Sequence, residues 1–420
     1  MSLSFPTPNN IVTRNRRRRH VRPTRTPKTQ TNNNMYKYKS KINGNNGKKL
    51  MFNDSDNENM DQHEHELLRS IKKLSLKKVN KTQSKLNVIT ITKSERIFNK
   101  KHKFGKILVE TNENGSGCCL YLSKWNNEPS VTKLMPLYKT NEFTKEENDL
   151  NALREFEIHE ELYRNSCKIY GKFSSIICPI WSCVRIKHND REYLAIVMPR
   201  YKCNLKEFIG LHGELRHNEA ILLLKTGIKF LLLCKEYNII HNDIKCENIF
   251  VNYITKYIIK NGKKEVRYMV KEFVFGDFGC SVYSDEEFPF GALTGTLYMW
   301  DIESLGYRHG KENGCSFEND LYGFIGALFD GIMGQCVIQN FLDNYLDGWD
   351  ELEWKQYTNA LRLCRKKFTK DKILNLLNKM EIKDKVLINI VLQLSLKRNQ
   401  RSNIYQINKY INKYINNSPN

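Results

Sequence analysis

The pattern of apolar and polar residues between positions 96 and 198 predicts a β-rich region. Residues 106–109 and 119–122 have the short aliphatic composition of strands, and a turn-forming segment separates them. Residues 193–198 form a continuous apolar run of the length of a buried strand, and a proline follows this run. The first half of the chain therefore favours a sheet.

Later in the chain the pattern becomes mainly helical. Residues 220–237 place apolar side chains at the spacing of a buried helix, and residues 319–329 and 386–396 are similarly apolar. One interruption, residues 253–270, is predicted to be a hairpin of two strands joined by an Asn-Gly turn. Strands followed by a run of helices predict an α+β fold.

Composition separates residues 1–95 from this patterned part. The formal net charge of the chain is +22, and residues 1–50 contain 13 Lys or Arg and no Asp or Glu. That segment is rich in Asn, Thr and Pro and poor in apolar residues, so we predict a disordered basic arm. The run from Arg16 to His20 is compatible with a nuclear-import signal, a nucleic-acid tether or a solvated tail.

The cysteines and the hydropathy exclude several classes of protein. The 12 cysteines are scattered, with one adjacent pair at Cys118 and Cys119 and no Cys-x-x-Cys spacing. This usage indicates reduced thiols in the cytosol or nucleus rather than a zinc cluster or a disulfide framework. We expect no membrane span, because no apolar run approaches about 18 residues, and no secretion, because the amino terminus lacks an apolar core.

The chemistry is concentrated in the octet His-Asn-Asp-Ile-Lys-Cys-Glu-Asn at residues 241–248 and the tripeptide Asp-Phe-Gly at residues 277–279. An aspartate that meets a substrate hydroxyl, a lysine two residues later and an asparagine five residues later suit phosphoryl transfer. The second aspartate, arriving from a later segment, would complete an oxygen-rich metal site.

These motifs resemble those of eukaryotic-type serine/threonine protein kinases, whose consensus is His-Arg-Asp-x-Lys-x-x-Asn followed by Asp-Phe-Gly. The resemblance covers roughly the last three quarters of the chain. The version with Asn242 is similar to that of kinases from baculoviruses and related insect large DNA viruses. The resemblance implies a two-lobed fold, with a basic arm at residues 1–95, a small β-rich lobe at residues 96–198 and a larger helical lobe at residues 199–415. It also implies that the protein acts in the nucleus or cytoplasm of a host cell.

In the small lobe, the resemblance implies an ATP site that uses Mg²⁺, or Mn²⁺ as an alternative. Lys133, 16 residues after Gly117, would bind phosphates. Its acidic partner would be Glu155, with Glu157 as the competitor. Met198 would border the adenine pocket, and the backbone near Tyr201 would bond the base. The loop over the phosphates would contain Asn112, Asn114, Gly115 and Gly117. An ordinary hairpin turn is the alternative interpretation of this loop.

In the large lobe, the resemblance implies that Asp243 is the base and that Lys245 neutralises the transferred phosphoryl group. Asn248 and Asp277 would bind Mg²⁺. Glu247 would contact basic side chains of a protein substrate, and Thr296 would link the substrate site to the catalytic loop. Structural roles would fall to His241, Phe278, Gly279, Asp320 and an ion pair of Glu303 with Arg401.

One departure from the kinase pattern carries its own expectation. Asn242 replaces the arginine that often receives an activation-segment phosphate, and an amide offers no charged bidentate fork. We therefore predict activity without such phosphorylation, although Ser281, Ser284 and Thr294 are available.

The leading hypothesis is a serine/threonine protein kinase acting on protein substrates, including basic nucleic-acid-associated proteins. A pseudokinase scaffold is the second hypothesis, because the glycine-rich loop and the Ala-Pro-Glu region are degenerate. A basic nucleic-acid-binding protein with a kinase-like core is the third. Lys245 disfavours a small-molecule phosphotransferase.

Overall fold

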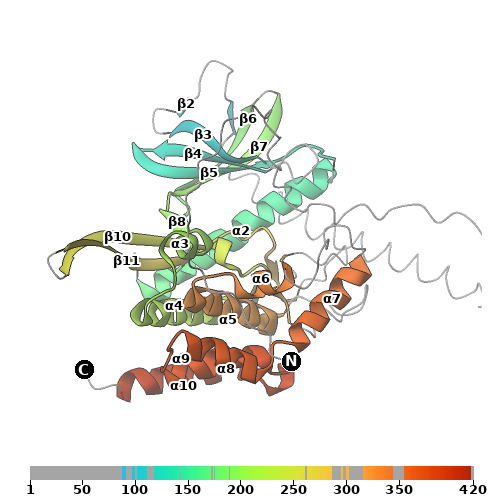
Figure 1. The fold of residues 1–420 in the computed structure, drawn as a ribbon. Helices are drawn as coiled ribbons and strands as arrows, with labels where there is room; N and C mark the ends of the chain where they lie inside the picture. Colours follow the sequence, from blue (N-terminus) through green and yellow to red (C-terminus); the bar gives the residue numbers. More distant parts are fainter. Residues whose placement is uncertain are drawn as a thin grey trace, which may run out of the picture. The chain divides into compact units, whose positions relative to one another are not determined.

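The structure is a computed structural model. It describes residues 88–90, 97–99, 102–110, 118–141, 143–171, 174, 176–188, 190–260, 263–285, 295–296, 299–301, 316–343 and 354–417. All of these belong to a compact unit within Lys41–Asn420. A β-rich part comes first in the sequence and a mainly helical part follows (Figure 1).

A seven-stranded sheet forms the β-rich part, with the order β1-β6-β7-β5-β4-β3-β2. Its pairs are antiparallel except that β1 runs parallel to β6. Strands β5 and β7 lie inside the sheet, with a neighbouring strand on each side. Both contain buried side chains, such as Leu134 of β5 and Ala195 of β7. The strands are β1 (Val88–Thr90), β2 (Ile97–Asn99), β3 (His102–Glu110), β4 (Cys119–Trp125), β5 (Glu128–Pro136), β6 (Ser182–His188) and β7 (Arg191–Pro199).

The long helix α2 (Lys145–Tyr170) packs on this sheet. It begins at a capping box in which Thr144 and Glu147 bond each other's backbone N–H groups, and it ends at Gly171. Leu153 and Phe156 of the helix join Leu194 and Ile196 of β7 in one apolar cluster. A second buried stripe on α2, at Ile158 and Leu162, belongs instead to the large core of the helical part.

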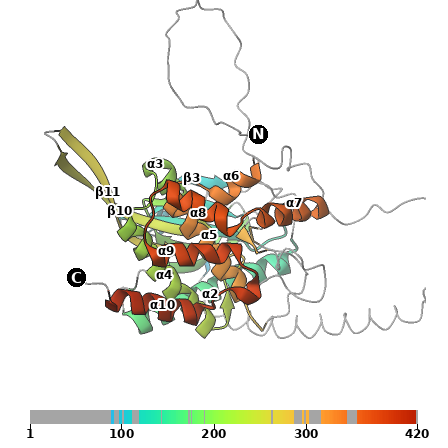
Figure 2. The ribbon, with the colours of Figure 1, turned by 60° about the horizontal axis from the view of Figure 1, so that its bottom comes forward.

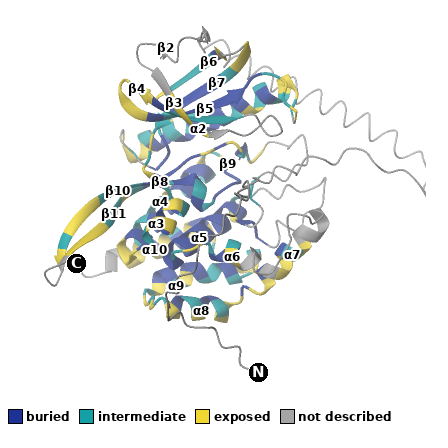
Figure 3. Cartoon of the chain, turned by 45° about the horizontal axis from the view of Figure 1, so that its top comes forward, coloured by how far each residue is buried: buried dark blue, intermediate teal, exposed yellow. Residues whose placement is uncertain are grey.

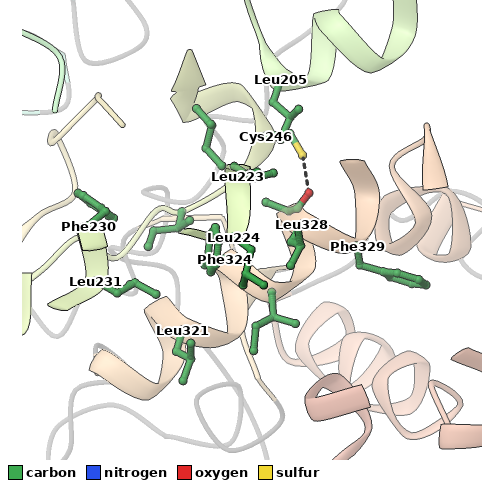
Figure 4. Close-up of a cluster of buried hydrophobic side chains, with 14 of the residues drawn as sticks. Leu205, Leu223, Leu224, Phe230, Leu231, Cys246, Leu321, Phe324, Leu328 and Phe329 are labelled. Carbon is green, nitrogen blue, oxygen red and sulfur yellow. Dashed lines mark hydrogen bonds between the residues drawn. The ribbon is translucent and has the colours of Figure 1, made fainter. Parts of the chain in front are cut away.

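The helical part is organised around α4 (His217–Glu236) and α5 (Phe317–Met333). Every residue of α5 from Asn319 to Met333 is buried, so this helix is surrounded by protein. Figure 4 shows Phe324 and Leu328 of α5 against Leu224 of α4. The remaining helices are α3 (Leu205–His212), α6 (Val337–Asp343), α7 (Trp354–Lys366), α8 (Lys370–Lys379), α9 (Lys385–Val391) and α10 (Ile404–Asn417), with short 3₁₀ segments η2 (Cys246–Asn248), η6 (Leu392–Ser395) and η7 (Arg398–Gln400).

Two small sheets lie in the helical part. The larger has the order β11-β10-β8, from β8 (Cys203–Asn204), β10 (Ile249–Lys260) and β11 (Lys263–Phe275). The smaller pairs β9 (Ile239–Ile240) with β12 (Val282–Tyr283). Strands β10 and β11 form a two-stranded ribbon whose distal end extends beyond helices α3 and α4 in two views (Figures 1 and 2).

Most of the expected elements are present. The strands predicted near residues 106–109, 119–122 and 193–198 are β3, β4 and β7, and the helices predicted at residues 220–237 and 319–329 are α4 and α5. The mixed α+β class and the hairpin at residues 253–270 are confirmed, while its turn at residues 261–262 lies outside the described residues. Strand β1 lies within the range expected for the arm. Within the part of the chain that the structure describes, no helix has the length and apolar character needed to cross a bilayer.

Candidate active site

Lys133, Glu155 and Asp277 meet although they come from three separate elements. Lys133 lies on β5 and donates to Glu155 Oε1 of α2 at 2.6 Å and to Asp277 Oδ1 at 2.8 Å. Glu155 is buried on the α2 face that packs toward β5, whereas Glu157, two residues further, is only half-buried. Lys133 and Asp277 are 144 positions apart in the sequence, so folding alone creates this cluster.

The charges in this cluster affect one another strongly. Burial alone would lower the pKa of Lys133, but the carboxylates of Asp277 and Glu155 outweigh it and raise that pKa well above its usual value. Lys133 holds the pKa of Asp277 below its usual range. Burial, reinforced by Asp277, raises the pKa of Glu155 despite the attraction of Lys133. Lys133 is therefore a fixed cation, and Asp277, whose side chain is 46% exposed, stays ionised beside it.

The residue after Phe278 lies against the Lys133–Glu155–Asp277 cluster. A Cβ at Gly279 would lie 3.3 Å from Glu155 Oε2, 3.5 Å from Asp277 Oδ1 and 3.6 Å from Lys133 Nζ. Glycine at this position lets the chain pass close to all three charged groups.

A second polar cluster surrounds Asp243. Asn248 donates from Nδ2 to the Asp243 carbonyl at 2.8 Å and to its Oδ2 at 2.9 Å, which folds η2 back on the loop. Thr296 donates to Asp243 Oδ1 at 2.6 Å, and Lys245 donates to Thr296 Oγ1 at 2.7 Å. Lys245 also lies 3.0 Å from Asp243 Oδ2. Burial opposes charge on Lys245, but Asp243 outweighs it and raises the lysine pKa.

Asp320, on the first turn of α5, forms hydrogen bonds with the loop that contains Asp243. Its carboxylate accepts from the backbone of His241 at 2.6 Å and of Asn242 at 2.8 Å. Burial raises the pKa of Asp320 to about 7, against the pull of these two bonds. Asn242 has φ 64°, in the left-handed region that asparagine enters more readily than arginine. That backbone geometry gives a local reason for an asparagine at this place in the octet.

The adjacent turn of chain approaches this loop closely. Gly295 has φ +100°, and a Cβ there would lie 2.1 Å from the Asn242 carbonyl oxygen. Any side chain at position 295 would push Thr296 away from Asp243 and Lys245.

His241 and Phe278 lie beneath the two clusters. Phe278 is fully buried, with its ring centroid 5.1 Å from that of His241 and 4.7 Å from that of His159 on α2. His241 Nε2 lies 3.2 Å from the Gly276 carbonyl oxygen, and its Nδ1 accepts from the backbone of Asp243 at 3.3 Å. Burial lowers the pKa of His241, so the neutral ring with a proton on Nε2 satisfies both contacts.

Other predicted residues have contacts of their own. Met198 pairs with Val131 across β5 and β7, and the Tyr201 ring stacks on Phe250 at 5.4 Å. Glu247 accepts from Lys206 of α3 at 2.7 Å. Arg401 forms an ion pair with buried Asp301 at 2.7 Å. Asn112, Asn114, Gly115, Gly117, Thr294 and Glu303 lie outside the described residues, so their predicted roles stay predictions.

Three participants were missed by sequence reasoning. His159 packs under Phe278, Lys206 binds Glu247, and Tyr283 of β12 donates to Glu161 of α2 at 2.8 Å. His159 lies one helical turn after Glu155, so its place on the same face was available from helical spacing. No sequence spacing relates Tyr283 to Glu161, which are 122 positions apart.

Two side chains of the site suit a hard cation such as Mg²⁺. Asn248 donates to Asp243 through its amide nitrogen. Its side-chain oxygen is the type of atom that Mg²⁺ takes as a ligand. Asp277 supplies a carboxylate kept ionised by Lys133. Among the described residues, no group of three or more His, Cys, Asp or Glu side chains could hold a metal ion. One carboxylate and one amide fit a cation that takes its other ligands from phosphates and water.

Comparison with known proteins gives a partial likeness. No family model matches the chain. It is 34% identical over 107 residues to the serine/threonine-protein kinase US3 homolog of Gallid herpesvirus 2 (strain GA) and, equally, to the protein kinase US3 homolog of strain Chicken/Md5/ATCC VR-987. The match covers 25% of this chain and spans 23% of the length of these curated relatives. The chain thus has a distant, partial similarity to herpesvirus serine/threonine protein kinases. The narrower resemblance to baculovirus kinases stays a prediction.

Proposed function

We propose that the chain is a serine/threonine protein kinase that transfers the γ-phosphoryl group of ATP to a protein hydroxyl. The observation that carries the proposal is the assembly of two clusters from distant segments. Lys133, Glu155 and Asp277 form the first cluster. Asp243, Lys245, Asn248 and Thr296 form the second. The herpesvirus likeness supports the same reaction class.

Each side chain has a defined task in this proposal. Asp243 orients the attacking hydroxyl and takes its proton as the oxygen bonds to the γ-phosphorus and ADP leaves. Lys245 offsets the negative charge that develops on the transferred group. Lys133, anchored by Glu155, binds the ATP phosphates. Asn248 and Asp277 would hold Mg²⁺, or Mn²⁺ in its place, which would supply positive charge beside the phosphates.

The division of the chain follows from the same proposal. Residues 96–198 correspond to the small lobe, residues 199–415 to the large lobe and residues 1–95 to an arm. Met198 and Tyr201 would border the adenine. Protein hydroxyls of serine and threonine are the proposed acceptors, since Thr296 links the acceptor side to Asp243 and Lys245.

Radioactive phosphate transfer from Mg-ATP to a basic protein, followed by phosphoamino-acid analysis, tests the proposal. Wild type is compared with Asp277→Asn and with Glu160→Gln, a control on α2 whose carboxylate accepts from the solvent-exposed Arg164. Label on serine or threonine that disappears in Asp277→Asn alone supports a kinase. ATP binding without transfer in the wild type would instead favour a pseudokinase scaffold.

A further inference from the structure

The distal half of the β10–β11 ribbon is an exposed element that the catalytic site does not use. Tyr257 is 64% exposed, Ile259 82% and Val266 47%. Figure 3 shows this end of the ribbon as mainly exposed, in contrast to the buried strand ends near α3 and α4. Exposed apolar side chains on neighbouring strands mark a contact surface more often than scattered single residues do.

The base of the same ribbon is firmly held. Tyr268 stacks on His212 of α3 with 3.8 Å between ring centroids, and Tyr253 lies 5.0 Å from the same histidine. Lys202 donates to the Tyr253 carbonyl at 2.6 Å. Glu219 of α4 accepts from the backbone of Val270 at 3.0 Å. The helical part therefore presents the distal half in a defined direction.

Positive charge dominates the distal half. Residues 256–267 contain five Lys or Arg and one acidic residue, Glu265. Lys256 is directly opposite Arg267 in the strand register, and both side chains are exposed. Like charges directly opposite each other destabilise a strand pair. A polyanion would remove this repulsion, so the charge pattern favours an anionic partner.

The arrangement of cations on the ribbon distinguishes between two kinds of anionic partner, one with a groove and one with a flat surface. Register partners share a face of a two-stranded ribbon and successive residues alternate, so Lys256 and Arg267 lie on one face. Ile259 and its partner Lys264 lie on the other, where Lys264 sits 4.1 Å from the Tyr257 ring centroid. A ribbon with cations on both faces matches a groove with two anionic walls. A lipid surface would meet one face only.

We propose that this distal half of the β10–β11 ribbon docks into the major groove of double-stranded DNA. That groove is about 12 Å wide and admits a two-stranded ribbon. Lys256 and Arg267 contact the phosphates of one wall and Lys264 those of the other, and Tyr257 and Ile259 contact sugars on the wall that Lys264 meets. The A-form major groove of double-stranded RNA is too deep and narrow for such a ribbon. Docking localises the site on DNA independently of the basic segment at residues 1–50.

Fluorescence anisotropy with a labelled duplex of about 20 base pairs, at several salt concentrations, tests the proposal in the full-length chain. The test variant is Lys256→Glu/Lys264→Glu/Arg267→Glu. The matched control is Lys397→Glu/Lys409→Glu/Lys413→Glu, which changes the charge equally at exposed lysines elsewhere. Thermal unfolding of all three proteins verifies that the fold is retained. Residues 1–50 are the same in each, so a difference between the two variants reflects the ribbon.

Each lost phosphate contact reduces the slope of log K against log salt by about 1, so the ribbon variant should lose up to about 3 from the slope. Its affinity near 0.1 M salt should fall by at least roughly tenfold relative to the control. Ile259→Ser should weaken binding without a change in slope. Equal affinities and slopes for the ribbon variant and its control would overturn the proposal. The proposal would also be overturned if the ribbon variant lost more affinity for anionic vesicles or for duplex RNA than for duplex DNA.

Discussion

Replacing Glu155 by glutamine should separate activity from stability. The change removes one charge, keeps the size of the side chain and leaves Lys133 with Asp277 as its remaining carboxylate partner at 2.8 Å. Lys133 then shifts toward Asp277, the residue proposed to hold the metal. The perturbation therefore misplaces a phosphate-binding cation and competes for a metal ligand at the same time.

The size of the effect follows from the lost contact. The Lys133–Glu155 bond is 2.6 Å long and joins two largely buried charges. A hydrogen bond to a charged group contributes about 1.5–3 kcal/mol. If that amount is lost in the transition state, the rate falls roughly 10- to 100-fold.

Stability should respond differently. Burial and the nearby Asp277 raise the pKa of Glu155 despite Lys133, so the ionised carboxylate is less favourable in the folded chain than in water. A group with a raised folded pKa favours folding below that pKa and loses this contribution as the pH rises through it. A neutral glutamine avoids that loss at pH 7. We expect the unfolding free energy to change by less than about 1 kcal/mol.

Steady-state phosphate transfer and thermal unfolding of Glu155→Gln, wild type and Glu160→Gln give the two readouts. We expect a large rate loss in Glu155→Gln alone, with the melting temperatures of the three proteins within about 3 °C of each other. Unchanged activity would show that Lys133 needs no anchor from α2. A rate loss accompanied by a large drop in melting temperature would show that Glu155 acts through folding.

Three further predictions concern neighbouring groups. Thr296→Val should lower kcat by roughly 10- to 100-fold in phosphate transfer, because two hydrogen bonds to charged groups are lost while the remaining contact of Lys245 with Asp243 offsets part of the loss, and Thr296→Ser should stay near wild type. Phosphatase treatment should leave activity unchanged, since Asn242 offers no charged fork for an activation-segment phosphate and Ser281 is buried and donates to the His241 carbonyl; a large loss of activity would contradict this. Burial lowers the pKa of His159 to about 4, so the unfolded chain binds more protons below pH 6.5 and stability falls on acidification. This group alone should contribute a loss of about 2 kcal/mol by pH 5, and denaturant unfolding of His159→Gln should show a flatter pH profile than wild type.

Local patterns predicted much of the fold. Apolar spacing identified α4 and α5, and the Asn-Gly turn between two apolar runs identified the hairpin. The motif frame also chose Glu155 over Glu157, and helical geometry explains why only one of them can face β5, since residues two apart lie on different sides of a helix. In each case the information lies within a few residues of sequence.

Contacts between distant segments were beyond such patterns. Arg401 was paired with Glu303 on the motif alone; Glu303 lies outside the described residues, and the buried Asp301 binds both Arg398 and Arg401. The bond from Tyr283 to Glu161 depends on how α2 packs beside β12, which no spacing encodes. Strand β1 has the β-prone composition Val-Ile-Thr, but it is only three residues long, and no local pattern indicates its parallel pairing with β6.

The long segment between the motifs at residues 241–248 and 277–279 allows a second surface to coexist with the candidate site. The inner ends of the ribbon are fixed where Ile249 pairs with Phe275 and where Gly276 donates to the Asn248 carbonyl at 3.1 Å. Phe275 also bridges to Ile177, so the position of Asp277 is set by contacts near the site. Residues added at the far end of the hairpin lengthen the ribbon without moving these contacts. The aspartate proposed to bind the metal and the ribbon proposed to bind DNA can therefore change independently, even though both belong to one continuous stretch of chain.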